Sequence, residues 1–113
     1  MEIRDLLQIK RGSAEVAVLA VLERQALHGY EIAKQIEARS GGELSFDVAS
    51  LYPLLYRLEA RGLVKGSWEE TPRGRRRRRY RLTSSGRKAL VPLRKQWRTF
   101  IQALELVAGV HGA

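Results

Sequence analysis

The stretch from Val48 to Val64, VASLYPLLYRLEARGLV, constrains the fold more than any other part of the chain. On a helix of about 100° per residue, one side collects apolar residues suited to burial, namely Val48, Leu51, Leu55 and Leu58. The other side carries small, hydroxyl, aromatic and guanidinium groups, namely Ala49, Ser50, Pro53, Tyr56 and Arg57. Such groups can approach a nucleic-acid groove and bond to its edges. The pattern predicts an amphipathic helix over 48–61, ended by Gly62, whose outer face is either merely solvated or a reading face.

A second helix is predicted just before this one, from Gly29 to about Arg39, and Gly41-Gly42 ends it. Asp47 can then cap the helix over 48–61. Two helices joined in this way, the second with a reading face, are typical of a helix-turn-helix. A proline in mid-helix costs about 3 kcal/mol or more. We therefore expect a distorted or 3₁₀-like opening turn at 48–52, which would place Pro53 in the first regular turn.

Two further helices are expected at the start of the chain. Residues 1–12 can form a short amphipathic helix that ends at Gly12. Ser13 can cap a second helix to about Arg24, whose run VAVLAVL is apolar nearly all round. This helix is therefore predicted to lie at the centre of the core, and a short break at 25–28 follows it.

Two strand-like runs, Leu63–Glu70 and Arg75–Leu82, flank the turn sequence Thr71-Pro72-Arg73-Gly74. Three helices followed by a two-stranded hairpin form a winged-helix arrangement, so the predicted fold class is mostly α with a small β-hairpin. The wing covers about residues 63–82, and the winged-helix domain covers residues 1–83. The sequence leaves the strand register open.

The positive charge of the chain is concentrated in this hairpin. The formal net charge is +9, yet residues 1–72 carry nine Lys or Arg against eleven Asp or Glu. Residues 73–81 carry seven Arg and no acid. A patch of this kind is typical of a polyanion-binding protein, most simply one that binds nucleic acid, although a solvated face is the plainer alternative. Because strand side chains alternate, consecutive arginines point to both sides of the ribbon and cannot all serve one surface.

Thr83 is expected to cap a last helix over 84–108. Its apolar residues are spaced three and four apart, namely Leu90, Leu93, Trp97, Phe100, Leu104 and Val107. That spacing is the seam of a coiled-coil-like contact, which predicts a homodimer through residues 84–113, with packing on its own domain as the alternative. Pro92 is expected to kink this helix or to make it begin afresh there.

Other classes of site find little support in the sequence. There is no cysteine, His28 and His111 have no metal-ligating neighbours at suitable spacing, and no cofactor is expected. No Ser/His/acid layout or glycine-rich phosphate loop is present, so no enzyme activity is expected. The longest apolar run, 16–22, is shorter than the about 20 residues of a membrane helix, and residues 1–5 have no signal-peptide layout. We expect a soluble, cytoplasmic protein without a membrane partner.

Three stretches resemble the PadR family of bacterial transcriptional repressors. They read LHGYEI (27–32), SLYPLLYRLEARGLV (50–64) and RRYRLTSSG (78–86), and the resemblance covers roughly residues 12–105. It implies a dimeric winged-helix repressor in the bacterial cytoplasm, associated with the nucleoid, with one C-terminal dimerisation helix and a palindromic operator. Two departures stand out: the chain has Ala49-Ser50 where the family commonly has Gly-Thr, and Pro92 is unusual in the dimerisation helix.

The candidate DNA contacts combine the resemblance with the residue chemistry. The resemblance places operator contacts on the helix over 48–61 and at Tyr30, and phosphate contacts on the hairpin arginines. Tyr30 can instead be a tyrosine at the core edge, and its hydroxyl beside Lys34 could reach a phosphate. The full set is Tyr30, Lys34, Ala49, Ser50, Leu51, Tyr52, Pro53, Tyr56, Arg57, Arg73, Arg75, Arg76, Arg77 and Arg78.

These observations favour a sequence-specific transcriptional regulator that acts as a repressor on a palindromic operator. A sequence-independent nucleic-acid-binding protein, RNA-associated or architectural, is the alternative, and an adaptor that binds an acidic protein is a third class. Trp97 is expected in the dimer seam, where two copies could instead line a cavity for a small aromatic inducer, as in some members of the family. The sequence does not reveal the operator or the regulated genes.

Overall fold

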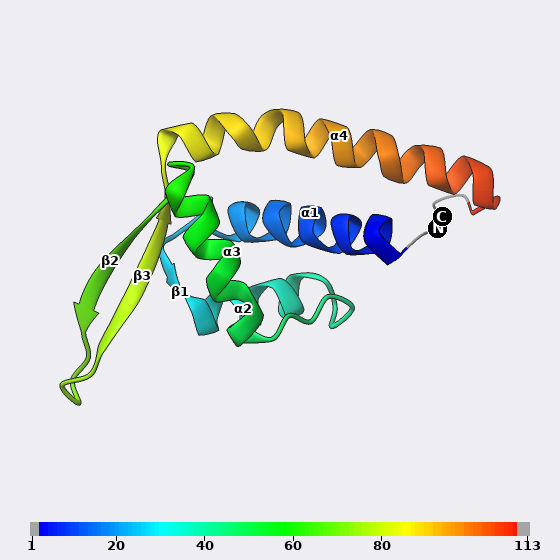
Figure 1. Ribbon diagram of the computed structural model, residues 1–113. Helices are drawn as coiled ribbons and strands as arrows, with labels where there is room; N and C mark the ends of the chain where they lie inside the picture. The colour runs from blue at the N-terminus through cyan, green and yellow to red at the C-terminus, as the bar shows by residue number, and fades with distance from the viewer. Residues whose placement is uncertain (1–2, 111–113) are drawn as a thin grey trace.

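The computed structural model of the chain describes the backbone of residues 3–110 and the side chains of residues 12–110. Within this part, four helices and three short strands follow one another (Figure 1). In chain order they are α1 (Ile3–Val21), β1 (Leu27–His28), α2 (Gly29–Arg39), α3 (Val48–Ala60), β2 (Val64–Glu70), β3 (Arg76–Leu82) and α4 (Ser84–Ala108). The predicted fold class, a winged helix-turn-helix with a C-terminal helix, is confirmed.

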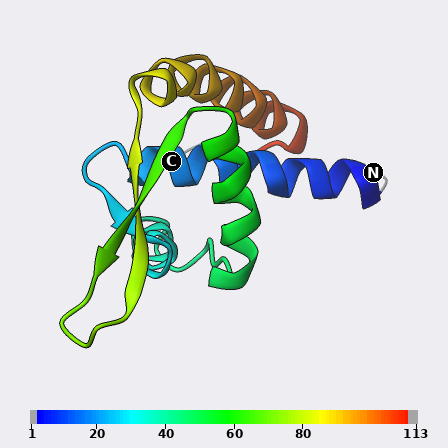
Figure 2. The same ribbon diagram turned by 60° about the vertical axis from the view of Figure 1, so that its left-hand side comes forward.

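The helices form a body from which the hairpin projects. Helix α4 lies along α1 with opposite direction, α2 lies below α1, and α3 runs across α1 near the end that is closest to the sheet (Figures 1 and 2). The β2-β3 hairpin points away from the helices in both views (Figures 1 and 2). Strand β1 adds to the outer edge of β3, so the sheet has the order β1-β3-β2 and three strands instead of the two expected. The predicted irregular break at 25–28 is therefore wrong for Leu27 and His28, which pair with Tyr80 and Arg79.

One hydrophobic core joins all the layers. Its completely covered residues come from every helix and from the sheet, and they include Val18, Leu19, Ile32, Leu55, Leu58, Tyr80 and Leu90. The prediction that the apolar run of the first helical region lies at the centre is confirmed by Val18 and Leu19. Tyr80 brings the sheet into this core, because its side chain is fully buried beneath the hairpin.

Helix α1 differs from the two helices that were predicted. It runs without interruption through Gly12 and ends at Val21, three residues before the expected end. A β-carbon built on Gly12 would lie 3.2 Å from Cζ2 of Trp97 in α4. The glycine therefore serves the close approach of two helices and does not end one. The side chains of residues 3–11 lie outside the described residues.

Helix α3 begins as expected, with the Asp47 carboxylate accepting a hydrogen bond from the backbone N–H of Ala49 at 3.2 Å. The helix is nevertheless regular from Val48 onward, so a distorted stretch over 48–52 is not observed. Pro53 consequently lies in the second turn, where it cannot supply the N–H that the carbonyl of Ala49 would receive. Both residues lie on the exposed side of the helix, where water can reach that carbonyl.

The hairpin and α4 agree with their predicted turn and cap. Thr71 accepts a hydrogen bond from the N–H of Gly74 at 2.9 Å, and Gly74 has a φ of 79°, which favours glycine. The Thr83 hydroxyl accepts a hydrogen bond from the N–H of Gly86 at 3.0 Å and so caps α4. Helix α4 continues through Pro92 and does not begin afresh there.

Gly86 lies where the packing leaves no room for a side chain. A β-carbon there would overlap the carbonyl oxygen of Leu63 and would lie 2.6 Å from Cδ1 of Leu82, so the end of the sheet leaves no room for it. Gly86→Ala should lower the free energy of unfolding by about 1–3 kcal/mol, although alanine is the better helix former. Urea unfolding measures the change, with the exposed neighbour Ser85→Ala as control. Equal midpoints for the two variants would contradict the packing argument.

Candidate nucleic-acid interface

The outer face of α3 carries most of the predicted groove-contacting residues. The exposed members are Ala49, Ser50, Tyr52, Pro53, Tyr56 and Arg57. Leu51 is a correction, because its side chain is only 1% exposed and packs in the core, where it cannot contact a groove. Around the helix, the small residues Ala49 and Pro53 occupy the middle of the exposed face. A backbone or a groove edge can approach closely there, between larger side chains on the two flanks.

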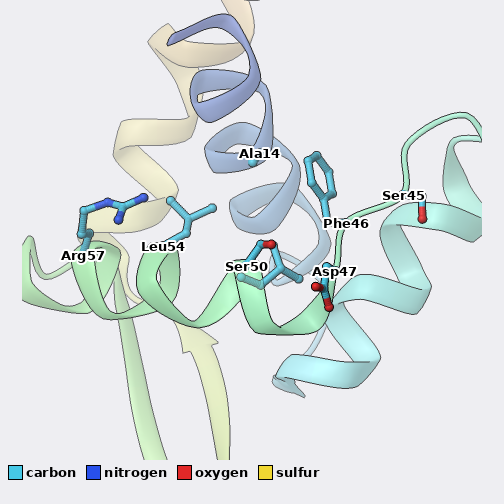
Figure 3. Close-up of a pocket in the computed structure, with 8 residues that line it drawn as sticks. Ala14, Ser45, Phe46, Asp47, Ser50, Leu54 and Arg57 are labelled. Carbon is cyan, nitrogen blue, oxygen red and sulfur yellow. The ribbon is translucent and has the colours of Figure 1, made fainter. Parts of the chain in front are cut away.

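Ser50 and Arg57 form the flank that faces away from the hairpin. Both line a hollow of about 360 Å³ between α3, α1 and the segment before α3, with Phe46 and Asp47 on its other wall (Figure 3). In this view the guanidinium of Arg57 lies beside Leu54 and above the helix (Figure 3). A hydroxyl and a guanidinium are thus presented two turns apart on one edge of the helix.

Tyrosines form the opposite flank, toward the hairpin. The rings of Tyr52 and Tyr56 have centroids 6.3 Å apart, and the ammonium of Lys34 lies 5.0 Å from the centroid of the exposed Tyr30 ring. A β-carbon on Gly29 would lie 3.2 Å from the Tyr52 ring, so this glycine lets Tyr52 pack on the start of α2. Because the Tyr30 side chain is exposed, Tyr30 is a surface residue. It lies beside Lys34, next to which its hydroxyl was expected to reach a phosphate.

Aromatic and basic side chains meet in the space between α3 and the hairpin. A cavity of about 340 Å³ is lined by Tyr52 and Tyr56 from α3 and by hairpin residues. The hairpin contributes Trp68, Arg76, Arg77, Arg78 and Tyr80. The outer face of α3 and the arginine hairpin therefore border one continuous surface.

The hairpin arginines form two groups, those that pair with Glu69 and those that are exposed near the turn. The register opposes Trp68 to Arg78 and Glu69 to Arg77. Arg77 and Arg79 lie 3.9 and 3.3 Å from the Glu69 carboxylate, which pairs with both across the two strands. Arg73, Arg75 and Arg76 are exposed near the turn, and Arg76 lies over the Trp68 ring at 5.1 Å from its centroid.

Arg78 lies differently from the other predicted phosphate contacts. Its side chain is 24% exposed, and its Nη2 donates a hydrogen bond to the Glu59 carboxylate of α3 at 2.8 Å. The sequence does not predict this contact, because 19 residues separate the two side chains and no periodic pattern links them. The guanidinium that was predicted to face DNA is thus engaged within the protein.

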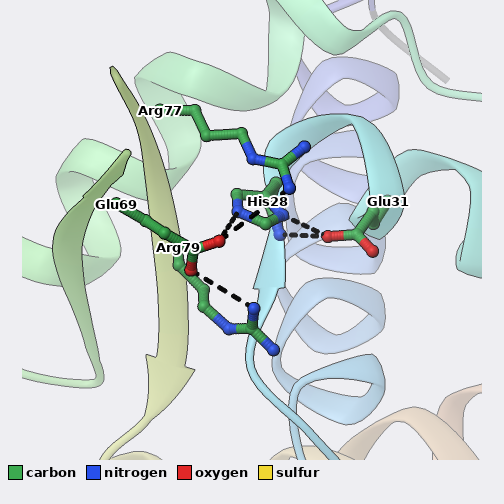
Figure 4. Close-up of polar contacts among 5 residues, drawn as sticks. All are labelled: His28, Glu31, Glu69, Arg77 and Arg79. Carbon is green, nitrogen blue, oxygen red and sulfur yellow. Dashed lines mark hydrogen bonds and ion pairs between the residues drawn. The ribbon is translucent and has the colours of Figure 1, made fainter. Parts of the chain in front are cut away.

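A second polar cluster, around His28 at the edge of the same cavity, has no counterpart among the predicted site residues. His28 is 5% exposed; its backbone N–H donates to the Glu31 carboxylate at 3.0 Å, and its ring Nδ1 is hydrogen-bonded to the same oxygen (Figure 4). Its Nε2 lies 3.6 Å from the Glu69 carboxylate, which also pairs with Arg77 and Arg79 (Figure 4). The His-x-x-Glu spacing of a capping box was the available signal. The cluster ties the first turn of α2 to the hairpin.

The predicted apolar seam of α4 is covered by the rest of the chain in its first half and exposed in its second half. Leu90 is completely buried in the core and Leu93 packs against it, so these two predicted dimer contacts are used within the chain. Trp97 packs edge-on against Phe100, with centroids 5.6 Å apart. The large exposed apolar residues of the second half of α4 are Phe100, Ile101, Leu104, Leu106 and Val107, the last being 87% exposed.

Ion pairing fastens the first half of α4 to the turn that follows α1. The Arg94 guanidinium donates to both carboxylate oxygens of Glu23, at 3.0 and 2.7 Å. These hydrogen bonds lower the pKa of Glu23 and raise the pKa of Arg94. The exposed second half of α4 therefore extends from a fixed base.

Residues 12–110 contain no group of three or more His, Cys, Asp or Glu side chains that could hold a metal ion. His111 lies outside the described residues. No helix in the described part of the chain is long and apolar enough to cross a membrane.

Helices α2 and α3, followed by an arginine-rich hairpin beside the exposed face of α3, define a winged helix-turn-helix protein of the DNA-binding class. The family model of the PadR-like transcriptional regulators matches residues 18–91, and the chain belongs to this family. It is a DNA-binding transcriptional regulator, and the resemblance found in its sequence is confirmed.

Individual relatives cover nearly the whole chain. An uncharacterized protein X of Lysinibacillus sphaericus is 29% identical over 98 residues, which are 87% of this chain and 90% of that protein. The crystal structure of a PadR family transcriptional regulator from Eggerthella lenta has a TM-score of 0.75 at 28% identity and covers 96% of this chain and 92% of its own. A transcriptional regulator from Clostridium thermocellum has a TM-score of 0.77 at 26% identity and covers 87% and 95%.

The His28 cluster predicts a pH-dependent contribution to stability. Hydrogen bonds from the backbone and the ring of His28 lower the pKa of Glu31 below its ordinary value of 4.5. Their contribution is present above that ordinary pKa and is lost as the pH falls through the lowered one. Because the Glu31 side chain is 46% exposed, water screens this contribution, so Glu31→Gln should be less stable than the wild type by about 0.5 kcal/mol at pH 7, and the gap should narrow below pH 4.5.

Urea unfolding between pH 7 and pH 3 provides this measurement. Glu37→Gln, at an exposed position of the same helix, is the matched control and should follow the wild type. A gap between the wild type and Glu31→Gln that stays constant over the range would show that the Glu31 charge does not stabilise the fold.

Proposed function

We propose that the protein is a sequence-specific repressor that binds a palindromic operator as a homodimer. The observation that carries this proposal is the continuity between the exposed face of α3 and the hairpin arginines across one cavity of about 340 Å³. A helix that reads a major groove and a wing that holds the adjacent backbone need such a shared surface. Residues 1–83 act as the DNA-binding unit in this proposal, and residues 84–113 as the dimerisation helix.

Base reading is assigned to the flank of α3 with Ser50 and Arg57, and backbone contacts to the hairpin. A guanidinium can donate two hydrogen bonds to guanine, and a good pair of this kind contributes about 1–3 kcal/mol of discrimination. Ala49, Tyr52, Pro53 and Tyr56 would lie against the groove walls, and Tyr30 with Lys34 would approach a flanking phosphate. Arg73, Arg75 and Arg76, with Arg77 at the edge of the cavity, would hold the flanks through phosphates or a narrow minor groove.

Selection of bound fragments from genomic DNA by the purified protein tests sequence specificity. A two-fold-symmetric site with half-sites about 34 Å apart is expected, since each dimer would place its two α3 helices in successive major grooves. Uniform recovery of fragments without a shared site would instead identify a sequence-independent nucleic-acid-binding protein.

Arg57→Ala should weaken binding to the selected operator by about 10-fold or more, and binding to random duplex DNA much less. Fluorescence anisotropy with both duplexes at one salt concentration gives the ratio. Equal losses on both duplexes would make Arg57 a backbone contact without a role in base reading.

The dimer is assigned to the exposed apolar edge in the second half of α4. Phe100, Leu104 and Val107 continue the heptad spacing and lie uncovered on the surface of the chain. Leu104→Glu should place a charge in this contact and give a monomer at micromolar concentration, with much weaker operator binding. Sedimentation measures the oligomeric state, with the exposed Thr99→Glu as control. A dimer that persists in Leu104→Glu would assign the contact to another surface.

A ligand site at Trp97 is a separate proposal, which an open cavity beside this residue favours. The cavity measures about 400 Å³ and is bordered by Val16, Arg94 and Ile101. A small planar aromatic inducer could stack on Trp97 there, where two copies would meet. Such compounds should quench tryptophan fluorescence in the wild type and in Trp68→Phe, but not in Trp97→Phe. Quenching that follows Trp68 instead would exclude this site.

A further inference from the structure

We propose that Glu59 and Arg78 form a brace that sets the position of the wing relative to α3, so that an acidic residue on the DNA-binding side is required for tight operator binding. This inference rests on the proposed function. It removes Arg78 from the set of phosphate contacts and makes it, with Glu59, a positioning residue.

A single carboxylate oxygen joins α3 to both strands of the hairpin. Oε2 of Glu59 accepts a hydrogen bond from the backbone N–H of Gly66 in β2 at 3.0 Å and one from Nη2 of Arg78 in β3 at 2.8 Å. The same Nη2 also donates to the carbonyl oxygen of Gly66 at 3.1 Å. The three groups form a closed set of hydrogen bonds, and its charge-assisted members are the stronger kind.

The surroundings hold Arg78 in place. Its guanidinium carbon lies 5.5 Å from the centroid of the Trp68 ring and 5.6 Å from that of Tyr80. A β-carbon on Gly66 would lie 2.7 Å from Nε and Nη2 of Arg78, so a glycine at this position leaves the room that the side chain occupies. At 24% exposure Arg78 is more covered than its neighbours Arg77 and Arg79, at 53% and 43%. The packing therefore selects one arginine of the run for an internal role.

The brace lies near the base of the hairpin, and the free arginines lie near its tip. About six residues separate Gly66 from Pro72, which correspond to about 20 Å of strand. A rotation of the hairpin by about 10° about its base would therefore move the turn by about 3.5 Å. This displacement is similar to the N···O distance of an ion pair, so it is enough to break a contact between an arginine and a phosphate. Because the hairpin projects from the body (Figure 2), small changes at Glu59 would change which phosphates Arg73 and Arg75 can reach.

The proposal predicts the opposite of what net charge predicts. Glu59→Gln removes a negative charge from a surface that binds a polyanion, so electrostatics alone would strengthen binding. If Glu59 is a brace, its loss should weaken operator binding by about 10-fold, since each wing would lose about one phosphate contact. Glu70→Gln makes the same charge change at an exposed position of β2 and should bind as tightly as the wild type or more tightly.

Fluorescence anisotropy with the operator duplex, over a series of salt concentrations, tests this prediction. The slope of log K against log salt should be smaller in magnitude for Glu59→Gln than for the wild type by about 2, and unchanged for Glu70→Gln. Hydroxyl-radical footprinting should show protection lost at the outer flanks and kept at the half-sites. A role of Glu59 in folding alone would change none of these readouts once the urea midpoint shows a folded variant.

The double variant Glu59→Gln/Arg78→Gln completes a double-mutant cycle, in which its operator binding is compared with that of the two single variants. If the two residues act through one contact, the double variant should bind no more weakly than Arg78→Gln alone. If Arg78 were instead a phosphate contact, the gain from Glu59→Gln and the loss from Arg78→Gln would add.

The proposal is overturned if Glu59→Gln binds at least as tightly as the wild type, if Glu70→Gln weakens binding equally, or if the two effects add. Absence of operator preference in the wild type would instead contradict the proposed function, so the two failures are distinguishable.

Discussion

The alternation of side chains along β3 is the constraint on which the interface depends. Tyr80 and Leu82 must point into the core, and this fixes the direction of every arginine that precedes them on the strand. Arg76 and Arg78 share the face of Tyr80, while Arg77 and Arg79 share the opposite face with Glu69. A run of five arginines therefore cannot form one binding surface, and each member has a role set by its distance from the core and by its side of the ribbon.

Glu59 and Glu69 are acids beside the basic region whose contacts position its arginines. Glu69 lies between the arginines of one face and the buried His28, and Glu59 joins the other face to α3. Neither contributes much to neutralising a chain of formal net charge +9. Each instead fixes guanidinium groups that would otherwise be free to turn. Part of the arginine run is consequently engaged within the protein.

Helix α4 shows that one apolar pattern need not be covered along its whole length. Its heptad spacing is continuous, yet Leu90 is buried in the core of its own chain whereas Leu104 and Val107 are exposed. Burial ends where α4 extends past the end of the shared core, and the spacing itself contains no sign of that point. The same distinction applies in α3, where the motif placed Leu51 among the DNA contacts and the packing buries it. A periodic pattern identifies a face but not what covers it.

Local chemistry determined much of this protein from sequence alone. The caps at Asp47 and Thr83, the turn at 71–74 and the charge of the hairpin involve residues close together in the chain, so their patterns can be read directly. Only the tertiary structure decided the features that depend on what approaches from elsewhere. Gly12 admits Trp97 and does not end a helix, the two residues of β1 are a strand only because β3 lies beside them, and Glu59 finds Arg78 19 residues away. Contacts between distant parts of the chain leave no fixed spacing in a sequence, because the fold alone sets which side chains meet.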